Sequence, residues 1–282
     1  MSKTADRAGR WVYRGVWGVL VGWLRVPDEA PNVPPGSGEV VRSLRPAPGF
    51  LSYLKVGFWV LAVIFDVVII GAGPAGASAA LLLARTGVRV TIVEAKAFPR
   101  VKVCGEFISP AATHLLEGLV AREELETIGA RRAETFVLEV GRREYAWKLP
   151  RPAWAVSRHA LDAMLLDRAR AAGAEIVQPA RAERAEFGDD GTRLVLRDGR
   201  ELAGDVLIHA DGSGRLDPAG PVKMRPGLVG CKCHVRDESR RIAGVRIRAC
   251  AGAYVGTMGV ESGMATCALV IRGELLRRAG GD

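Results

Sequence analysis

The chain has 282 residues, of which 49% are hydrophobic and 25% are charged, so it can bury a core and is not an intrinsically disordered protein. Its 34 glycines follow no three-residue period, which excludes a collagen-like fold. The net charge of +9 fits an arginine-rich solvated surface or a basic face toward anionic lipid or an anionic cofactor. The Lys and Arg residues form no concentrated basic stripe along the sequence, so nucleic-acid binding is not predicted.

Residues 1–65 differ in composition from the remainder and are predicted to be a separate N-terminal extension. Residues 11–26 are apolar and rich in Trp and Arg, which suits either a membrane interface or an element packed on the main body. Six prolines within residues 27–48 predict an extended linker. Residues 51–65 predict a helix whose uninterrupted apolar run is too short to span a bilayer as it stands.

Residues 66–70 are a continuous apolar, β-branched run that predicts a buried parallel strand. Residues 75–86, rich in Ala and Leu, predict a helix, and residues 88–94 predict a second strand. A β-α-β unit of this length implies a parallel sheet with a right-handed crossover. Further along, residues 159–173 predict an amphipathic helix, and strands joined by tight turns are predicted up to residue 212.

A glycine-rich motif, Gly71-Ala-Gly73-Pro-Ala75-Gly76, connects the first of these strands to its helix. In such a motif the first glycine permits a tight turn, the second lets the backbone approach a pyrophosphate, and the third allows close helix–strand packing. The helix N-terminus offers free N–H groups to the phosphates. Glu94 ends the next strand, where its carboxylate would accept hydrogen bonds from a ribose and disfavour a 2′-phosphate. Gly71, Gly73, Ala75, Gly76 and Glu94 are therefore predicted to bind FAD or NAD, and not NADP.

A basic loop, Pro99-Arg-Val-Lys-Val-Cys-Gly-Glu106, follows shortly after Glu94. With the glycine motif it resembles the geranylgeranyl reductase family of FAD-dependent oxidoreductases, within the larger group that includes flavin-dependent aromatic hydroxylases and halogenases. The resemblance implies that Arg100 reaches the FAD. It also implies that Cys104 and Glu106 lie toward the flavin ring or substrate cavity, which makes them the candidate catalytic residues. For Cys104, a packed thiol without a chemical role is the alternative.

The segment Ser157-Arg-His-Ala-Leu-Asp162 is similar to a family motif that opens a helix, and the resemblance places Arg158 near the FAD phosphates or ribityl chain. From the residues alone, Ser157 is a candidate N-cap and Asp162 a first-turn acid. His159 is expected to be a surface residue with no role as a base.

Asp211-Gly212, after an apolar strand over residues 205–209, resembles the family's D-G motif, in which the Asp contacts flavin and the Gly allows close approach. The segment from Ala180 to Ala182 is expected on the edge strand near the adenine, which it would contact through backbone atoms. Residues 226–271 resemble the start of the family's substrate sheet and alternate around Gly256 and Gly263 as in a hairpin.

We therefore predict an α/β protein with a Rossmann-like FAD-binding domain and an incomplete antiparallel-sheet substrate domain. The FAD-binding domain is expected over residues 66–105 and 152–222, and the partial substrate domain over residues 106–151 and 223–282. Members of the family continue with a second G-D-A-A-G-like segment and an aromatic Y-x-W-x-F-P motif, neither of which occurs in this sequence. We expect a C-terminally truncated member whose flavin site lacks one wall.

The resemblance implies an oxidoreductase that reduces C=C bonds of a geranylgeranyl-type isoprenoid by hydride transfer from reduced FAD, with NADPH or another electron donor. A flavin-dependent monooxygenase or halogenase, and an inactive flavin-binding fragment, are the alternatives. The expected partner is a small hydrophobic molecule. The five cysteines show no paired C-x-x-C spacing, so no zinc site is predicted and reduced thiols in a cytoplasmic protein are expected, with peripheral membrane contact as a further option. In a strand, Cys231 and Cys233 would share one face.

Overall fold

The computed structural model describes residues 66–188, 191–212, 227–237 and 244–280, together with the backbone of two short strands near the N-terminus. These two strands, β1 (Ser2–Ala5) and β2 (Trp11–Arg14), pair antiparallel. The linker predicted over residues 27–48 and the helix predicted over residues 51–65 lie outside the described residues. In the described part of the chain, no helix is long and apolar enough to cross a membrane.

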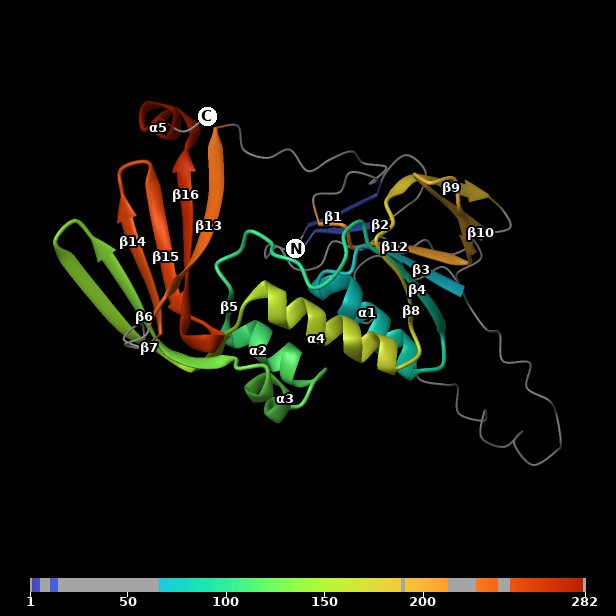
Figure 1. Cartoon of the computed structure of the whole chain (residues 1–282), viewed down its shortest axis with the longest axis horizontal. Helices are drawn as coiled ribbons and strands as arrows, with labels where there is room; N and C mark the ends of the chain where they lie inside the picture. The colour runs from blue at the N-terminus through green and yellow to red at the C-terminus, as the bar shows by residue number, and fades with distance from the viewer. Residues whose placement is uncertain are drawn as a thin grey trace.

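A four-stranded parallel sheet forms the first layer of the fold (Figure 1). Its strand order is β12-β3-β4-β8, and the strands are β3 (Asp66–Ile70), β4 (Arg89–Val93), β8 (Glu175–Val177) and β12 (Val206–His209). Helix α1 (Pro74–Arg85) connects β3 to the parallel strand β4, so the predicted β-α-β unit is confirmed.

Both faces of this sheet are buried, which explains the continuous apolar run in β3. Val67 and Ile69 belong to a core cluster that includes Leu81 of α1 and Leu166 of α4 (Arg158–Ala171). Figure 1 shows α1 and α4 lying side by side. Burial of each such aliphatic side chain contributes about 1.5–3 kcal/mol, so this layer is a main source of stability.

The opposite face of the sheet is covered by a three-stranded antiparallel sheet of order β11-β10-β9. Its strands are β9 (Ala182–Gly188), β10 (Gly191–Leu196) and β11 (Glu201–Gly204). Val68 and Ile70 of β3 pack in one cluster with Leu194 and Leu196 of β10. Alternate residues of β3 therefore serve two separate cores, as the period of a strand requires.

A seven-stranded sheet lies on the other side of α4 (Figure 1). Its order is β13-β16-β15-β14-β6-β7-β5, and its strands are β5 (Phe107–Ile108), β6 (Arg131–Val140), β7 (Arg143–Ala155), β13 (Leu228–Arg236), β14 (Val245–Cys250), β15 (Ala253–Gly259) and β16 (Met264–Arg272). All neighbours pair antiparallel except β14 and β6, which are parallel.

The predicted hairpin is formed by β15 and β16. The chain reverses in a short 3₁₀ turn, Glu261–Gly263, where Gly263 has a φ of +67°. Gly256 instead lies inside β15 opposite Ala268, so only one of the two glycines serves the turn. Three further helices are α2 (Pro110–Glu117), α3 (Arg122–Thr127) and α5 (Gly273–Arg278).

Trp154 near the end of β7 is fully buried and joins the seven-stranded sheet to the helices. It belongs to a core cluster with Leu116 of α2, Leu125 of α3 and Leu165 of α4. Its ring N–H donates a 2.9 Å hydrogen bond to Glu117, so the one polar atom of the buried indole is satisfied. Helix α4 thus contributes to the cores on both of its sides, and this fixes its N-terminus between the two large sheets.

The register of the seven-stranded sheet assigns its side chains to two faces. We call one the Glu106 face, because Lys232, His234 and Thr266 on it contact Glu106. Following the paired positions across the sheet, the same face carries Met258, Ile247, Phe136, Leu138, Trp147, Tyr145 and Tyr254. We call the other the cysteine face, and it carries Cys231, Cys233 and Cys267 with the ion pairs of Glu139 to Arg246 and Arg248.

Candidate functional site

The glycine-rich loop lies at the C-terminal edge of the four-stranded sheet, where the ends of three strands meet. The Gly71 N–H donates a 2.8 Å hydrogen bond to the carbonyl oxygen of Val93 at the end of β4. The Ala210 N–H, just after β12, donates one of 2.8 Å to the carbonyl oxygen of Ile70. Ligands of open α/β sheets bind at this edge, so the backbone has the arrangement that a nucleotide requires.

The fold requires glycine at two of the three glycine positions of the loop, and the third differs from them. Gly71 has a φ of +98°, and a Cβ there would lie 2.6 Å from the carbonyl oxygen of Ala210. A Cβ on Gly76 would overlap the carbonyl oxygen of Gly71, so only glycine allows α1 to begin this close to β3. At Gly73 the nearest atom would be a guanidinium nitrogen of Arg158 at 3.7 Å, an ordinary contact. The chain itself does not need glycine at position 73, so the approach that Gly73 permits is available to a ligand.

Glu94 accepts hydrogen bonds from the backbone of the glycine-rich loop and of the segment after β4. Its side chain is buried and accepts a 2.9 Å hydrogen bond from the Ala72 N–H and a 3.0 Å hydrogen bond from the Lys96 N–H. Each carboxylate oxygen has a second lone pair, so Glu94 keeps the capacity to accept hydrogen bonds from a ribose. Its position at the end of β4 fits that role, which stays a prediction.

Two arginines converge on the space beside Gly73. The guanidinium groups of Arg158 and Arg100 lie 3.7 Å and 3.9 Å from the position that a Gly73 Cβ would occupy. Asp162 fixes Arg158 with two hydrogen bonds of 2.6 Å and 2.7 Å. Arg100 lies between Asp162, at 3.8 Å, and Glu94, at 3.6 Å. Both guanidinium groups are mostly buried, so an anion between them would be strongly attracted.

The role of Asp162 differs from the prediction. It lies beyond the first turn of α4, its side chain is fully buried, and its partner is Arg158 four residues earlier. The prediction of a first-turn acid that stabilises the helix dipole was therefore wrong, because the carboxylate serves to orient a guanidinium. Burial lowers the pKa of Arg158, but the hydrogen bonds and charge of Asp162 outweigh that effect and raise it overall.

Lys102 adds a third cation to the same space. Its Nζ would lie 3.3 Å from a Cβ on Gly212. Burial, and then the charges of Arg100 and Arg158, lower the pKa of Lys102. The charges of Asp162 and Glu94 oppose this shift but do not outweigh it, and the mutual repulsion of the three cations would be relieved by a bound anion.

Two further observations indicate that the site fits the pyrophosphate of a dinucleotide. Helix α1 begins at the loop with Gly73 as its N-cap, and no side chain caps its first N–H groups. Within the described residues, the Nε of Arg100 is buried and has no hydrogen-bond acceptor. A phosphate oxygen is the acceptor that both kinds of donor lack. In the same described part, no group of His, Cys, Asp and Glu could hold a metal ion.

The start of α4 agrees with two predictions from the sequence. Ser157 is the N-cap, and its hydroxyl accepts a 3.1 Å hydrogen bond from the Ala160 N–H. His159 is exposed. A second acid assists the cap, because the Ser157 N–H donates a 3.0 Å hydrogen bond to Glu261 of the 3₁₀ turn. The helix end that carries Arg158 is thus fixed by the side chains of Ser157 and Glu261.

Within the segment from Ala180 to Ala182, only Ala182 is on an edge strand, and that strand is β9 of the three-stranded sheet and not β8 of the parallel sheet. The edge strand β8 ends at Val177, and Pro179 has no N–H with which to continue the ladder. Ala182 instead begins β9 of the three-stranded sheet. The Ala180 N–H donates a 2.7 Å hydrogen bond to the carbonyl oxygen of Glu94, so the segment does pass beside the end of β4.

Asp211 and Gly212 follow β12 and adjoin the glycine-rich loop. Gly212 has a φ of +79°, and a Cβ on Gly71 would approach the Cα of Asp211 to 2.9 Å. The structure therefore brings together the segments around Gly71, Glu94, Arg100, Arg158 and Asp211. Direct contact of each of these residues with a flavin stays a prediction.

Glu106 occupies the centre of a buried hydrogen-bond network that the sequence analysis missed. Its carboxylate accepts hydrogen bonds of 2.5 Å from Lys232 and 2.7 Å from His234, and another from Thr266. The backbone N–H of Arg158 donates a fourth, of 2.8 Å. The carboxylate is fully buried, and the backbone of Glu106 is held at a φ of +59°. A strained conformation of this kind persists only where the surroundings over-determine it.

The pKa of Glu106 is lowered although burial alone would raise it. Hydrogen bonds from His234, Lys232 and Thr266, and then from the Arg158 N–H, outweigh the burial. The carboxylate is therefore ionised at neutral pH, and it is poorly suited to donate a proton. The geometry suits a residue that positions its partners, and the catalytic role given to Glu106 stays a prediction.

Cys104 contacts both the Glu106 network and Arg158, which lies beside the glycine-rich loop. Its sulfur accepts a 3.4 Å hydrogen bond from the Glu106 N–H, and it also interacts with Arg158. The thiol is partly buried. Cys104 therefore packs against the residues of the site, which leaves both of its interpretations open.

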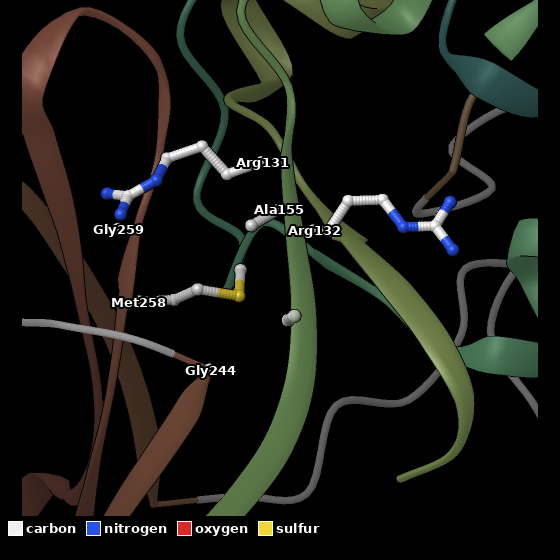
Figure 2. A pocket seen from close by; sticks show the side chains of 7 residues that line it. Arg131, Arg132, Ala155, Gly244, Met258 and Gly259 are labelled. Atoms are coloured by element: carbon white, nitrogen blue, oxygen red, sulfur yellow. The ribbon is translucent and has the colours of Figure 1, made fainter.

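Figure 2 shows a small pocket away from the glycine-rich loop, between β6, β7 and β15. Its lining residues are Arg131, Arg132, Ala133, Ala155, Gly244, Met258 and Gly259. Arg131 and Arg132 point to opposite sides of β6, and Arg132 stacks 4.8 Å over the ring of Trp154. None of the residues predicted to bind a cofactor lines this pocket, so it is not the nucleotide site.

A glycine-rich loop at the carboxyl edge of a parallel sheet, with an uncapped helix N-terminus and buried arginines, defines a dinucleotide-binding protein of Rossmann-like fold. Comparison with known proteins gives the family. The model of the FAD binding domain family matches residues 65–215, and the chain belongs to this family. Its relatives include reductases and halogenases.

Three curated relatives illustrate that range. A menaquinone reductase of Mycobacterium tuberculosis is 36% identical over 154 residues, which cover 52% of this chain and 38% of the relative. A tryptophan 2-halogenase of Chondromyces crocatus is 36% identical over 133 residues, covering 46% of this chain and 25% of the relative. A digeranylgeranylglycerophospholipid reductase of Methanopyrus kandleri is 35% identical over 153 residues, covering 52% and 37%. The matches span well under half the length of these relatives.

Among solved structures, a flavoprotein/dehydrogenase from Cytophaga hutchinsonii superposes with a TM-score of 0.67. The match covers 76% of this chain and 57% of that structure at 22% identity. At this identity the likeness shows the fold alone, and it agrees with the predicted Rossmann-like FAD-binding fold.

Proposed function

We propose that the chain is the flavin-binding part of an oxidoreductase that reduces C=C bonds of an isoprenoid substrate by hydride transfer from reduced FAD. The observation that carries this proposal is the apolar, aromatic surface on the Glu106 face of the seven-stranded sheet. Trp147, Tyr145 and Tyr254 on this face are 50%, 43% and 45% exposed. Large exposed apolar side chains on one face are typical of a binding surface for an apolar partner.

The position of this surface supports the same substrate class. It shares a face with Met258 and Thr266, which lie beside Glu106. The charged groups at that end, Lys232 and His234, are already engaged by Glu106. A hydrocarbon chain would gain about 0.8 kcal/mol for each CH₂ that it buries there. The name of the Methanopyrus kandleri relative, a reductase of a digeranylgeranyl lipid, points to the same chemistry.

The residues of the chain have separate tasks in this proposal. FAD, when bound, supplies the hydride. The loop at Gly73, the N-terminus of α1 and the cations Arg100, Lys102 and Arg158 would hold its pyrophosphate, and Glu94 its ribose. Glu106, as a buried anion, keeps Lys232 and His234 oriented on the substrate side of the sheet.

A monooxygenase or halogenase acting on an aromatic substrate is the second candidate. The observation that favours it is the match to a tryptophan 2-halogenase over 133 residues, which is as identical as the match to the menaquinone reductase. The flavin-binding residues serve either chemistry. A flavin-binding fragment without activity is the third candidate, because the matches cover only part of each relative.

Anaerobic reoxidation of the flavin separates these candidates. The chain is loaded with FAD, reduced with NADPH or dithionite, and mixed without oxygen with a geranylgeranyl lipid, while flavin absorbance and product mass are followed. We expect the lipid to reoxidise the flavin and gain two hydrogen atoms for each flavin. Turnover that requires oxygen and adds oxygen or halide to an aromatic substrate would overturn the proposal in favour of the second candidate. Loaded flavin with neither activity would favour the third.

The cofactor site itself is tested by Gly73→Val. Within the described residues, a Cβ at position 73 lies within 4 Å of two guanidinium groups and of no backbone atom beyond its chain neighbours. The fold should therefore be retained, but the side chain would occupy the space for the pyrophosphate. We expect the affinity for FAD to fall at least about 100-fold, since closely fitted phosphate contacts are lost. Titration of FAD with circular dichroism as the fold control checks this, and stoichiometric FAD in the folded variant would refute the assignment. Gly188→Val, at an open position in β9, is the matched control.

A further inference from the structure

Two cysteines of the seven-stranded sheet face each other directly. Cys233 of the edge strand β13 is paired with Cys267 of β16 in the antiparallel register. Residues directly opposite in such a pair have Cα atoms about 4.5 or 5.5 Å apart, depending on their place in the ladder. A disulfide spans Cα separations of about 4.4–6.8 Å, so either value allows the bond without a shift of the backbone.

The two thiols are paired neighbours that differ in their surroundings. Cys233 is exposed, whereas Cys267 is partly buried. Burial, and then the neighbouring Cys233, raise the pKa of the Cys267 thiol. Cys267 is therefore the poorer nucleophile of the pair, and the accessible Cys233 is the position at which an oxidant would react first.

We propose that Cys233 and Cys267 form an oxidation site that hydrogen peroxide closes to an intramolecular disulfide. The thiolate of Cys233 attacks one peroxide oxygen and becomes a sulfenic acid while the other oxygen leaves as hydroxide and is protonated to water. The Cys267 sulfur then attacks the sulfenic sulfur, its proton is released, and a second water leaves. The two thiols lose two electrons and two protons in total, and one peroxide is reduced to two waters. This inference does not depend on the substrate proposed above.

The site has a structural consequence for the opposite face of the sheet. Lys232 and His234 lie on either side of Cys233 in β13, and both point to Glu106. Among the strands that the structure describes, β13 is an edge strand and pairs with β16 alone. A disulfide at position 233 would fasten the strand at the residue between these two donors. Oxidation on the cysteine face would thus stabilise the network on the Glu106 face.

The other cysteines provide internal controls. Cys231 is on the same strand and the same face, but its partner across the ladder is Leu269. Cys250 is exposed and bonds to the carbonyl oxygen of Ala253, and Cys104 lies beside Arg158. Cys231→Ser therefore removes an exposed thiol of the same strand without removing the pair.

The test treats the full chain with hydrogen peroxide, blocks the remaining thiols, and maps disulfides by mass spectrometry of non-reduced peptides. We expect a Cys233–Cys267 linked peptide, its abolition in Cys233→Ser and in Cys267→Ser, and its retention in Cys231→Ser. Linkage to Cys231, an intermolecular disulfide, or oxidation to sulfinic acid without a disulfide would overturn the assignment. An intramolecular disulfide that persists in Cys233→Ser would do the same.

Hydrogen exchange tests the structural consequence. We expect the amides of β13 that bond to β16 to exchange at least about tenfold more slowly in the oxidised chain, since the bond opposes local opening. The amides of β10, in a different sheet, should not change. Unchanged exchange in β13 of a chain shown to carry the disulfide would refute the fastening of the strand.

Discussion

The glycine-rich loop and the Glu106 network meet at one residue, Arg158, yet they are ordered by different forces. The guanidinium of Arg158 lies 3.7 Å from the position of a Gly73 Cβ. The backbone N–H of the same residue donates a 2.8 Å hydrogen bond to the Glu106 carboxylate. Around Gly71 and Gly76 the backbone approaches so closely that no side chain fits. Around Glu106 one buried anion is surrounded by donors. The loop should therefore be sensitive to added atoms, and the network to lost charge.

Gly76→Ala gives the largest expected effect. The new Cβ would overlap the carbonyl oxygen of Gly71, and two backbone segments cannot yield as a side chain can. We expect the free energy of unfolding to fall by more than about 3 kcal/mol, beyond the usual cost of overpacking. Urea denaturation measures this. Gly188→Ala, where no atom lies within 4 Å of the added Cβ, should change stability little, and an equal loss there would contradict the steric argument.

Glu106→Gln should have the next largest effect and a distinct pH dependence. The amide nitrogen of Gln cannot accept a hydrogen bond, so donors such as Lys232 lose a partner, at a cost of about 3 kcal/mol at pH 7. The pKa of Glu106 is lowered below its ordinary value of 4.5, so its stabilising contribution is complete above that pH and is lost as the pH falls through the folded-state pKa. The difference in stability between the two proteins should therefore shrink toward acid.

The matched control for this prediction is Glu261→Gln. Glu261 accepts a hydrogen bond from the Ser157 N–H, and the carbonyl oxygen of Gln can accept the same bond. We expect a smaller loss than for Glu106→Gln. Urea denaturation between pH 3 and pH 7 gives the free energy of unfolding of each protein. A constant difference between Glu106→Gln and the unsubstituted chain at all pH values would contradict the role of the charge.

Ser157→Ala should give the smallest effect, at the junction of the two parts. Loss of the N-cap hydroxyl leaves the Ala160 N–H without its acceptor and should cost about 1 kcal/mol. Ser109→Ala removes the corresponding cap of α2, whose bond to the Ala112 N–H is longer at 3.4 Å, and should cost less. Thermal or urea unfolding ranks the two, and a larger loss at Ser109 would indicate that α4 does not depend on its cap.

What the sequence could predict follows from the range of the forces involved. The bounds of β3, the β-α-β unit, the N-cap Ser157 and the glycine-rich loop depend on neighbours along the chain, and they were predicted correctly. The partners of Glu106 could not be predicted, because Lys232 and Thr266 are 126 and 160 residues away and reach it only through the register of β13 and β16. Asp162 was misjudged although its partner Arg158 is only four residues earlier, because it lies beyond the first turn of α4 and its burial comes from packing between layers. The signal that the sequence did offer was the alternation of Lys232 and His234 along one face of a strand.

The wide sequence separation within the Glu106 network also has a consequence for synthesis on the ribosome. The segments that form the glycine-rich site are complete once residue 212 has been made, whereas Thr266, a partner of Glu106, is made 54 residues later (266 − 212). At about 5–20 residues per second, Glu106 waits several seconds for its last partner after the nucleotide-binding layer can assemble. During that interval the Glu106 carboxylate lacks the Thr266 hydroxyl, and β13 has no β16 to pair with, so its edge hydrogen-bonding groups stay open.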